Sequence, residues 1–212
     1  MFLKLLKYEG IALGRWLLPF YLLFIVLYLF FTYVENGQET DIIFVSFLCF
    51  FVLAIKMLSA FVVLCRFYSN FFKDEGYLTF TLPVSVWEHV AAKFLSVLLV
   101  VVLFETLSAG ILSSKGIMNF YNIFFAEGNM LEEIVYISFL CLKAYLAITL
   151  GHLLANHPIF GAVLAYIVLN IFFYSIISIV GTTDHVYVYG LPFSVICYVA
   201  TCLLLREKLE LS

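Results

Sequence analysis

The chain has 212 residues, of which 65% are hydrophobic and only 12% are charged. A soluble fold of this length cannot bury so much apolar surface, because most of its outer shell must face water. The composition therefore excludes an ordinary soluble domain and predicts an integral membrane protein. The formal net charge of −3 says little about partners, since the side of the membrane on which each charge lies matters more. We expect no nucleic-acid partner.

The first 15 residues are expected to form an amphipathic elbow helix that lies flat on the anionic cytoplasmic leaflet. Helical projection places Phe2, Leu5, Leu6, Ala12 and Leu13 on one side and Lys4, Lys7 and Arg15 on the other. Glu9 falls in the middle of the apolar side, which suggests that this side partly faces protein. The alternative is a plain basic flank that only sets the topology.

Six apolar runs follow, and each is long enough to cross a hydrocarbon core of about 30 Å. They cover residues 16–34, 42–65, 94–114, 134–154, 159–181 and 188–205. Only helices satisfy their own backbone hydrogen bonds in lipid without closing into a barrel. The sequence therefore predicts an all-α membrane protein, a single transmembrane domain of six transmembrane helices.

The distribution of lysine and arginine predicts that both ends of the chain lie in the cytoplasm, N-in and C-in. In this orientation the inside collects eight basic residues: Lys4, Lys7, Arg15, Arg66, Lys73, Lys93, Arg206 and Lys208. The outside keeps only Lys115, while acidic residues such as Glu35 and Asp184 lie there.

The longest predicted cytoplasmic segment covers residues 66–93, between the second and third spans. Ser85 and Glu88 form a capping-box pattern, which predicts that a helix starts at about Ser85 and extends a couple of turns below the membrane. Before Gly76 there is room for a short amphipathic helix with several phenylalanines. An exposed aromatic element of this kind is what a cytoplasmic partner would contact.

Two stretches of this segment form a specific pattern. They are Arg66-Phe67-Tyr68-Ser69-Asn70 and Asp74-Glu75-Gly76-Tyr77-Leu78-Thr79-Phe80-Thr81-Leu82-Pro83-Val84-Ser85. The pattern resembles the cytoplasmic loop of small ABC-2-type permeases of Gram-positive bacteria. Three further segments are similar to that family: Lys7-Tyr8-Glu9, Gly14-Arg15-Trp16-Leu17-Leu18-Pro19 and the stretch from Gly151 to Tyr166.

The resemblance implies a half-transporter in a bacterial plasma membrane, with an elbow helix, six spans and a coupling helix that docks on an ATP-binding subunit. Carried over to this sequence, the residues that would contact that subunit are Tyr68, Asn70, Phe71, Lys73, Asp74, Glu75, Gly76 and Tyr77. ATP and Mg would be bound by the separate subunit, and this chain has no G-x-x-x-x-G-K-[ST] phosphate loop. We therefore expect no cofactor and no enzymatic activity here. A second permease chain, identical or similar, would complete a dimer.

Three ionisable residues fall near the middle of the predicted spans. At about 1.5 Å per residue from the cytoplasmic ends, Lys56 lies about 15 Å deep, Glu105 about 18 Å and Lys143 about 14 Å. An unpaired charge at that depth costs about 2.5 to 3.5 kcal/mol, so these side chains should face protein or a wet cavity. We hypothesise that Glu105 pairs with one lysine and that the other lysine meets an anionic group of the substrate. The alternative is a structural ion pair, or a snorkelling lysine without a ligand.

The sequence thus predicts the permease subunit of an ABC exporter that moves a lipid-like or peptide substrate. A second candidate is an antimicrobial-peptide sensing or immunity module, in which the same complex removes a peptide or lipid from the membrane. An ATP-independent channel or carrier is less favoured, because its expected inverted repeats with broken helices are absent from the sequence except for a soft break near Gly181. No metal site is expected, since His152 and His157 project about 140° apart on a helix.

Overall fold

The computed structural model describes residues 2–34, 42–72, 85–113, 130–154, 157–180 and 186–210. The helices are α1 (Phe2–Val34), α2 (Ile42–Phe72), α4 (Val86–Ser113), α6 (Met130–Leu154), α7 (Pro158–Val180) and α8 (Val186–Glu210). Each contains a stretch that is long and apolar enough to cross a membrane. The prediction of six helices able to span a membrane is therefore confirmed.

The first helix is longer than the predicted first span. α1 runs without interruption from Phe2 to Val34, so the turn expected between an elbow helix over 1–15 and a span over 16–34 is absent. At 1.5 Å per residue, α1 is about 50 Å long, which exceeds a hydrocarbon core by about 20 Å. Its first turns are attached to α2 and α4 through Glu9. A position of these turns on the membrane surface stays a prediction.

The second helix also continues beyond its predicted span. Residues 66–72, expected to begin a separate amphipathic helix, form the last turns of α2. Phe67 and Phe71 lie one helical turn apart and are both buried, and Phe67 stacks on Tyr145 of α6 with ring centroids 3.9 Å apart. This packing keeps the chain helical as far as Phe72. Residues 73–84 lie outside the described residues.

The start of α4 agrees with the predicted capping box. The backbone N–H of Ser85 donates to the Glu88 carboxylate at 3.2 Å, and the Glu88 N–H donates to Ser85 Oγ at 3.4 Å. These reciprocal bonds satisfy backbone donors that the first turn of a helix leaves unpaired. α4 therefore begins at Val86, about two turns before the predicted membrane span over 94–114.

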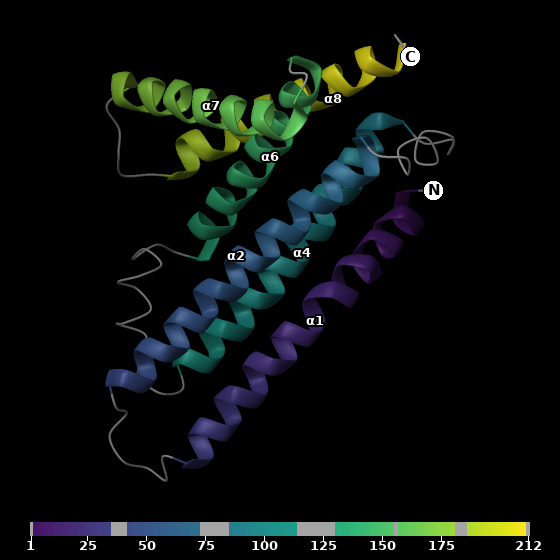
Figure 1. The fold of residues 1–212 in the computed structure, drawn as a ribbon. Helices are drawn as coiled ribbons and strands as arrows, with labels where there is room; N and C mark the ends of the chain where they lie inside the picture. The colour runs from purple at the N-terminus through teal and green to yellow at the C-terminus, as the bar shows by residue number, and fades with distance from the viewer. Residues whose placement is uncertain are drawn as a thin grey trace.

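The helices form two groups. α1, α2 and α4 lie side by side as three long helices, while α6 packs most extensively against α7 and α8 (Figure 1). α6 also contacts α2 and α4, and α8 contacts α4, so the two groups share one core. The larger buried cluster draws residues from all six helices: Leu13, Val63, Phe67, Phe71, Val90, Val97, Phe139, Leu142, Tyr145, Leu146, Phe173, Cys197, Cys202 and Leu205.

The backbones of α6 and α7 approach closely where the two helices meet. A Cβ atom built on Gly151 of α6 would lie inside contact distance of the Ala162 backbone N and Cα, and 2.6 Å from the Gly161 carbonyl carbon. Small residues at such crossings let membrane helices pack backbone to backbone. Gly151 therefore sets the spacing between α6 and α7.

Helix ends gather at one end of the molecule. Glu9, near the start of α1, bonds to Arg66 near the end of α2 and to Lys93 near the start of α4. His152, near the end of α6, stacks on Phe72 with ring centroids 4.4 Å apart. The C-terminus of α8 lies at this end as well, so both ends of the chain are on the same side of the bundle (Figure 1).

Candidate functional site

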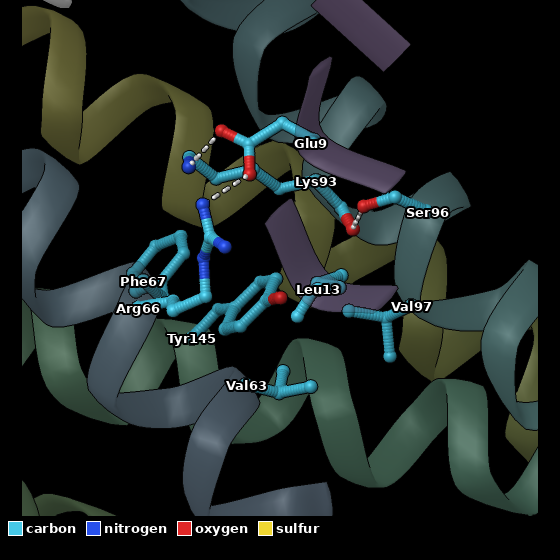
Figure 2. Close-up of a pocket in the computed structure, with 9 residues that line it drawn as sticks. All are labelled: Glu9, Leu13, Val63, Arg66, Phe67, Lys93, Ser96, Val97 and Tyr145. Carbon is cyan, nitrogen blue, oxygen red and sulfur yellow. Dashed lines mark hydrogen bonds and ion pairs between the residues drawn. The ribbon is translucent and has the colours of Figure 1, made fainter. Parts of the chain in front are cut away.

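A cluster of charged side chains joins α1, α2 and α4 at this shared end. Lys93 Nζ donates to Glu9 Oε1 at 2.6 Å, and Arg66 Nη2 donates to Glu9 Oε2 at 3.3 Å (Figure 2). Asn70 Nδ2 donates to Glu9 Oε1 at 3.2 Å. One carboxylate from α1 therefore holds three donors, two from α2 and one from α4. We call Glu9, Arg66, Asn70 and Lys93 the charge cluster.

The charge cluster is largely withdrawn from solvent. The exposed fractions of the Lys93, Glu9 and Arg66 side chains are 5%, 13% and 25%. Because the site is partly desolvated, the attraction between the charges is stronger than at a protein surface, and an unpaired member would be costly. Lys93 Nζ also lies 5.4 Å from the centre of the Phe71 ring, a cation–π contact that helps to fix the ammonium group.

A small cavity lies directly beneath the charge cluster. Its lining combines charged and polar side chains with buried apolar ones: Glu9, Leu13, Val63, Arg66, Phe67, Lys93, Ser96, Val97 and Tyr145 (Figure 2). It has room for about one water molecule, far too little for a lipid or peptide substrate. In this conformation the cluster therefore links helices and does not hold a substrate.

The local sequence explains how Lys93 reaches this position. The capping box starts α4 at Val86, and Ser96 Oγ donates to the Lys93 carbonyl oxygen one turn later. Tyr198 of α8 donates its hydroxyl to the Trp87 carbonyl oxygen at 2.8 Å, which holds the first turn of α4 against α8. The capping box and the hydrogen bond from Tyr198 therefore fix the start of α4, and with it the position of Lys93.

The predicted coupling residues fall into three groups. Asn70 belongs to the charge cluster, and Tyr68 is half-buried and stacks on Phe72 with centroids 5.9 Å apart. Phe71 is only 4% exposed and faces the core of its own chain, so its ring is covered here and not open to a partner. The remaining five, Lys73, Asp74, Glu75, Gly76 and Tyr77, lie outside the described residues.

Sequence reasoning missed Arg66 and Lys93 as site residues and treated them only as charges that set the topology. The available signal was Glu9, whose place on an apolar helix face requires a cationic partner when that face is buried. The sequence could not identify the partners, since Arg66 and Lys93 follow Glu9 by 57 and 84 residues.

Lys143, which is predicted to lie near the middle of the membrane, has a polar partner that the sequence did not indicate. Its Nζ donates to Asn170 Oδ1 of α7 at 2.8 Å and lies 4.9 Å from the Phe139 ring centre and 5.0 Å from that of Tyr166. Asn170 in turn donates to the Tyr166 carbonyl oxygen. Lys143 is 4% exposed, so this amide and two aromatic faces enclose it between α6 and α7.

The predicted pairing of Glu105 with a lysine stays a prediction. Glu105 belongs to α4, but its side chain is outside those that the structure describes. Lys56 lies on α2 and is half-buried, and its carbonyl oxygen accepts a hydrogen bond from Ser59 Oγ. Lys56 and Lys143 therefore belong to different helix groups.

The Lys143 contact leads to a stability prediction. Asn170→Leu should destabilise the chain by about 2 to 3 kcal/mol, because it leaves a buried ammonium group without its oxygen acceptor. Lys143→Met should cost less, because it removes the charge and keeps the side-chain length. Thermal unfolding of the chain in detergent micelles measures both. In the Lys143→Met background Asn170→Leu should cost under about 1 kcal/mol, and an equal cost in both backgrounds would show that the contact contributes nothing.

No family model, curated protein or solved structure matches the chain. Any assignment of function therefore depends on the residues, their geometry and the resemblance of residues 66–85.

Proposed function

We propose that the chain is the membrane-spanning permease subunit of an ABC exporter, with both ends in the cytoplasm of a bacterial cell. Two permease chains, identical or similar, would bind two ATP-binding subunits and move a lipid-like or peptide substrate. The observation that best supports this is the charge cluster, because it connects the end of α2 to α1 and α4. The end of α2 carries Tyr68, Asn70 and Phe71 of the predicted docking element and leads directly into its remaining residues, 73–77.

Charge distribution supports the orientation. The end of the bundle that holds the charge cluster also holds the start of α1 and the end of α8 (Figure 1). These helix ends carry the exposed Lys4, Lys7 and Arg206. Basic residues at helix ends are retained on the cytoplasmic side. Under this proposal the ATP-binding subunits approach the end at which the helices are tied together.

The charge cluster suggests how movement would be passed on. ATP hydrolysis in the partner supplies the work, and this chain receives it as a displacement of residues 73–77. Arg66 and Asn70 lie in the last turns of α2, so a shift of those turns acts on Glu9 and, through Lys93, on the start of α4. Three long helices would then move as a unit, which is how small shifts at an interface become larger displacements.

The proposal is tested by purifying the tagged full-length chain from native membranes and identifying the proteins bound to it. We expect an ATP-binding protein with a phosphate loop to copurify. Asp74→Ala and Gly76→Val should leave this complex intact but reduce the stimulation of its ATPase activity by about tenfold, within the usual range of coupling between sites.

The matched control is Asp184→Ala, which removes an acidic residue from the loop predicted to lie outside and should leave the stimulation unchanged. The proposal is wrong if no ATP-binding protein copurifies, or if the Asp74 and Gly76 variants keep normal stimulation in an intact complex. A label at Asp74 that reacts only from outside the cell would also contradict it.

A further inference from the structure

The exposed face of α1 changes its chemistry along the helix. Six positions, 3, 4, 7, 8, 11 and 15, project from one side of the first four turns, and all six side chains are exposed. They are Leu3, Lys4, Lys7, Tyr8, Ile11 and Arg15. The same face continues with exposed apolar residues only: Leu18, Leu22, Val26 and Leu29. One side of α1 is therefore basic up to Arg15 and apolar beyond it.

No acidic residue of α1 neutralises this basic face. The sequence of Phe2–Val34 contains a single acid, Glu9, and its carboxylate points to the opposite side, toward Arg66 and Lys93. Leu13, on the same side as Glu9, is buried. The side of α1 that carries Glu9 and Leu13 therefore packs against protein, as the position of Glu9 indicated, and the basic side is exposed.

The change from basic to apolar occurs where a membrane surface would lie. The apolar part of α1, from Trp16 to Val34, is about 28 Å long, which matches a hydrocarbon core of about 30 Å. Trp16 is 62% exposed, and tryptophan is typical of the boundary between headgroups and hydrocarbon. Arg15 then lies at headgroup level, with Lys7 and Lys4 farther from the hydrocarbon.

We propose that the basic face of α1, made by Lys4, Lys7 and Arg15, binds the phosphate headgroups of anionic phospholipids. Arg15 makes the closest contact, since its guanidinium group can hold a phosphate through two hydrogen bonds. Lys7 and Lys4 lie about 12 Å and about 16 Å farther along α1, so they add a weaker attraction that salt screens. A lipid is favoured over an acidic protein surface because the basic face is continuous with the apolar face that hydrocarbon covers. This inference does not depend on the proposed transport function.

The experiment measures which lipid lies next to Trp16. The chain has two tryptophans, so Trp87→Phe leaves Trp16 as the only one. The full chain with this substitution is reconstituted into phosphatidylcholine vesicles that contain either dibrominated phosphatidylglycerol or dibrominated phosphatidylcholine, whose bromines quench nearby tryptophan. We expect about fivefold preference for the anionic lipid at Trp16, from the attraction of basic residues near an anionic surface.

Two variants decide the outcome. Lys4→Gln/Lys7→Gln/Arg15→Gln should reduce the preference to about one. Lys4→Arg/Lys7→Arg, which keeps all three charges and the Arg15 guanidinium group, should retain the preference, and added salt should weaken it as in the parent protein. Equal quenching by both lipids in the parent protein would overturn the proposal. A preference that survives the triple glutamine substitution would overturn it too. A further result would be that the parent protein shows no lipid preference while a protein that copurifies with it is lost in the triple glutamine variant. That result would overturn the proposal and assign the basic face to an acidic protein partner.

Discussion

Glu9→Gln is expected to destabilise the chain by about 2 to 4 kcal/mol. Glutamine keeps the shape of the side chain but removes the negative charge, so Lys93 and Arg66 lose the carboxylate that they share in a partly desolvated site. Breaking a buried ion pair by removing one partner typically costs about 3 to 5 kcal/mol. The lower range applies because Arg66 is a quarter exposed and solvent screens part of its charge.

Thermal unfolding in detergent micelles or lipid nanodiscs measures the effect. The matched control is Glu88→Gln, which removes an exposed carboxylate from the start of α4 and should cost at most about 1 kcal/mol through its cap. A loss no greater for Glu9→Gln than for Glu88→Gln would show that the charge cluster does not hold the helices together.

A compensated variant separates stability from coupling. In Glu9→Gln/Lys93→Met the most buried cation is removed along with the carboxylate, so part of the lost stability should return. Under the proposed function this variant should fold and bind the ATP-binding subunit but show weakened stimulation of ATP hydrolysis. Normal stimulation in the compensated variant would remove the charge cluster from the coupling pathway and leave it a structural role.

Gly151→Ala should also destabilise the chain, by about 3 kcal/mol, at the upper end of the usual cost of overpacking. The new Cβ would collide with the backbone of Gly161 and Ala162, and backbone atoms cannot move aside as a flexible side chain can. α6 and α7 would have to separate, which would also disturb the Lys143 contact with Asn170 farther along the same pair of helices.

Gly14 provides the matched control for this substitution. It is also a helical glycine, but a Cβ atom built on it meets nothing within 4 Å. Gly14→Ala should therefore be neutral or stabilise the chain by up to about 1 kcal/mol, through the higher helix propensity of alanine. If both glycine substitutions change the melting temperature equally, the close approach of α6 and α7 is not what limits stability.

The features that the sequence predicted well depend on local patterns. Apolar runs of about 20 residues identified the six helices, because length and composition alone decide whether a segment can cross lipid. The start of α4 was predicted to within a residue, since Ser85 and Glu88 are three positions apart and bond to each other. Such signals lie within one helical turn and need no knowledge of the tertiary fold.

The features that the sequence missed depend on contacts between distant segments. α1 and α2 continue as helices past the predicted ends of the elbow helix and of the second span, because Glu9 and Phe67 have partners on other helices. Asn170 was not identified as the partner of Lys143, although it lies 27 residues later on the next helix. For the site, the sequence indicated that Glu9 faces protein but could not say which cations meet it.

Glu9 and Lys93 of the charge cluster are far apart in the sequence, so they are synthesised at different times. Lys93 follows Glu9 by 84 residues, and ribosomes add roughly 5 to 20 residues per second. The carboxylate of Glu9 therefore waits several seconds after α1 has emerged before its strongest partner exists. During that interval the start of α1 is best kept at the water-facing boundary, where the carboxylate stays hydrated. Closure of this end of the bundle is accordingly a late event of biogenesis, which can follow only after α4 has been made.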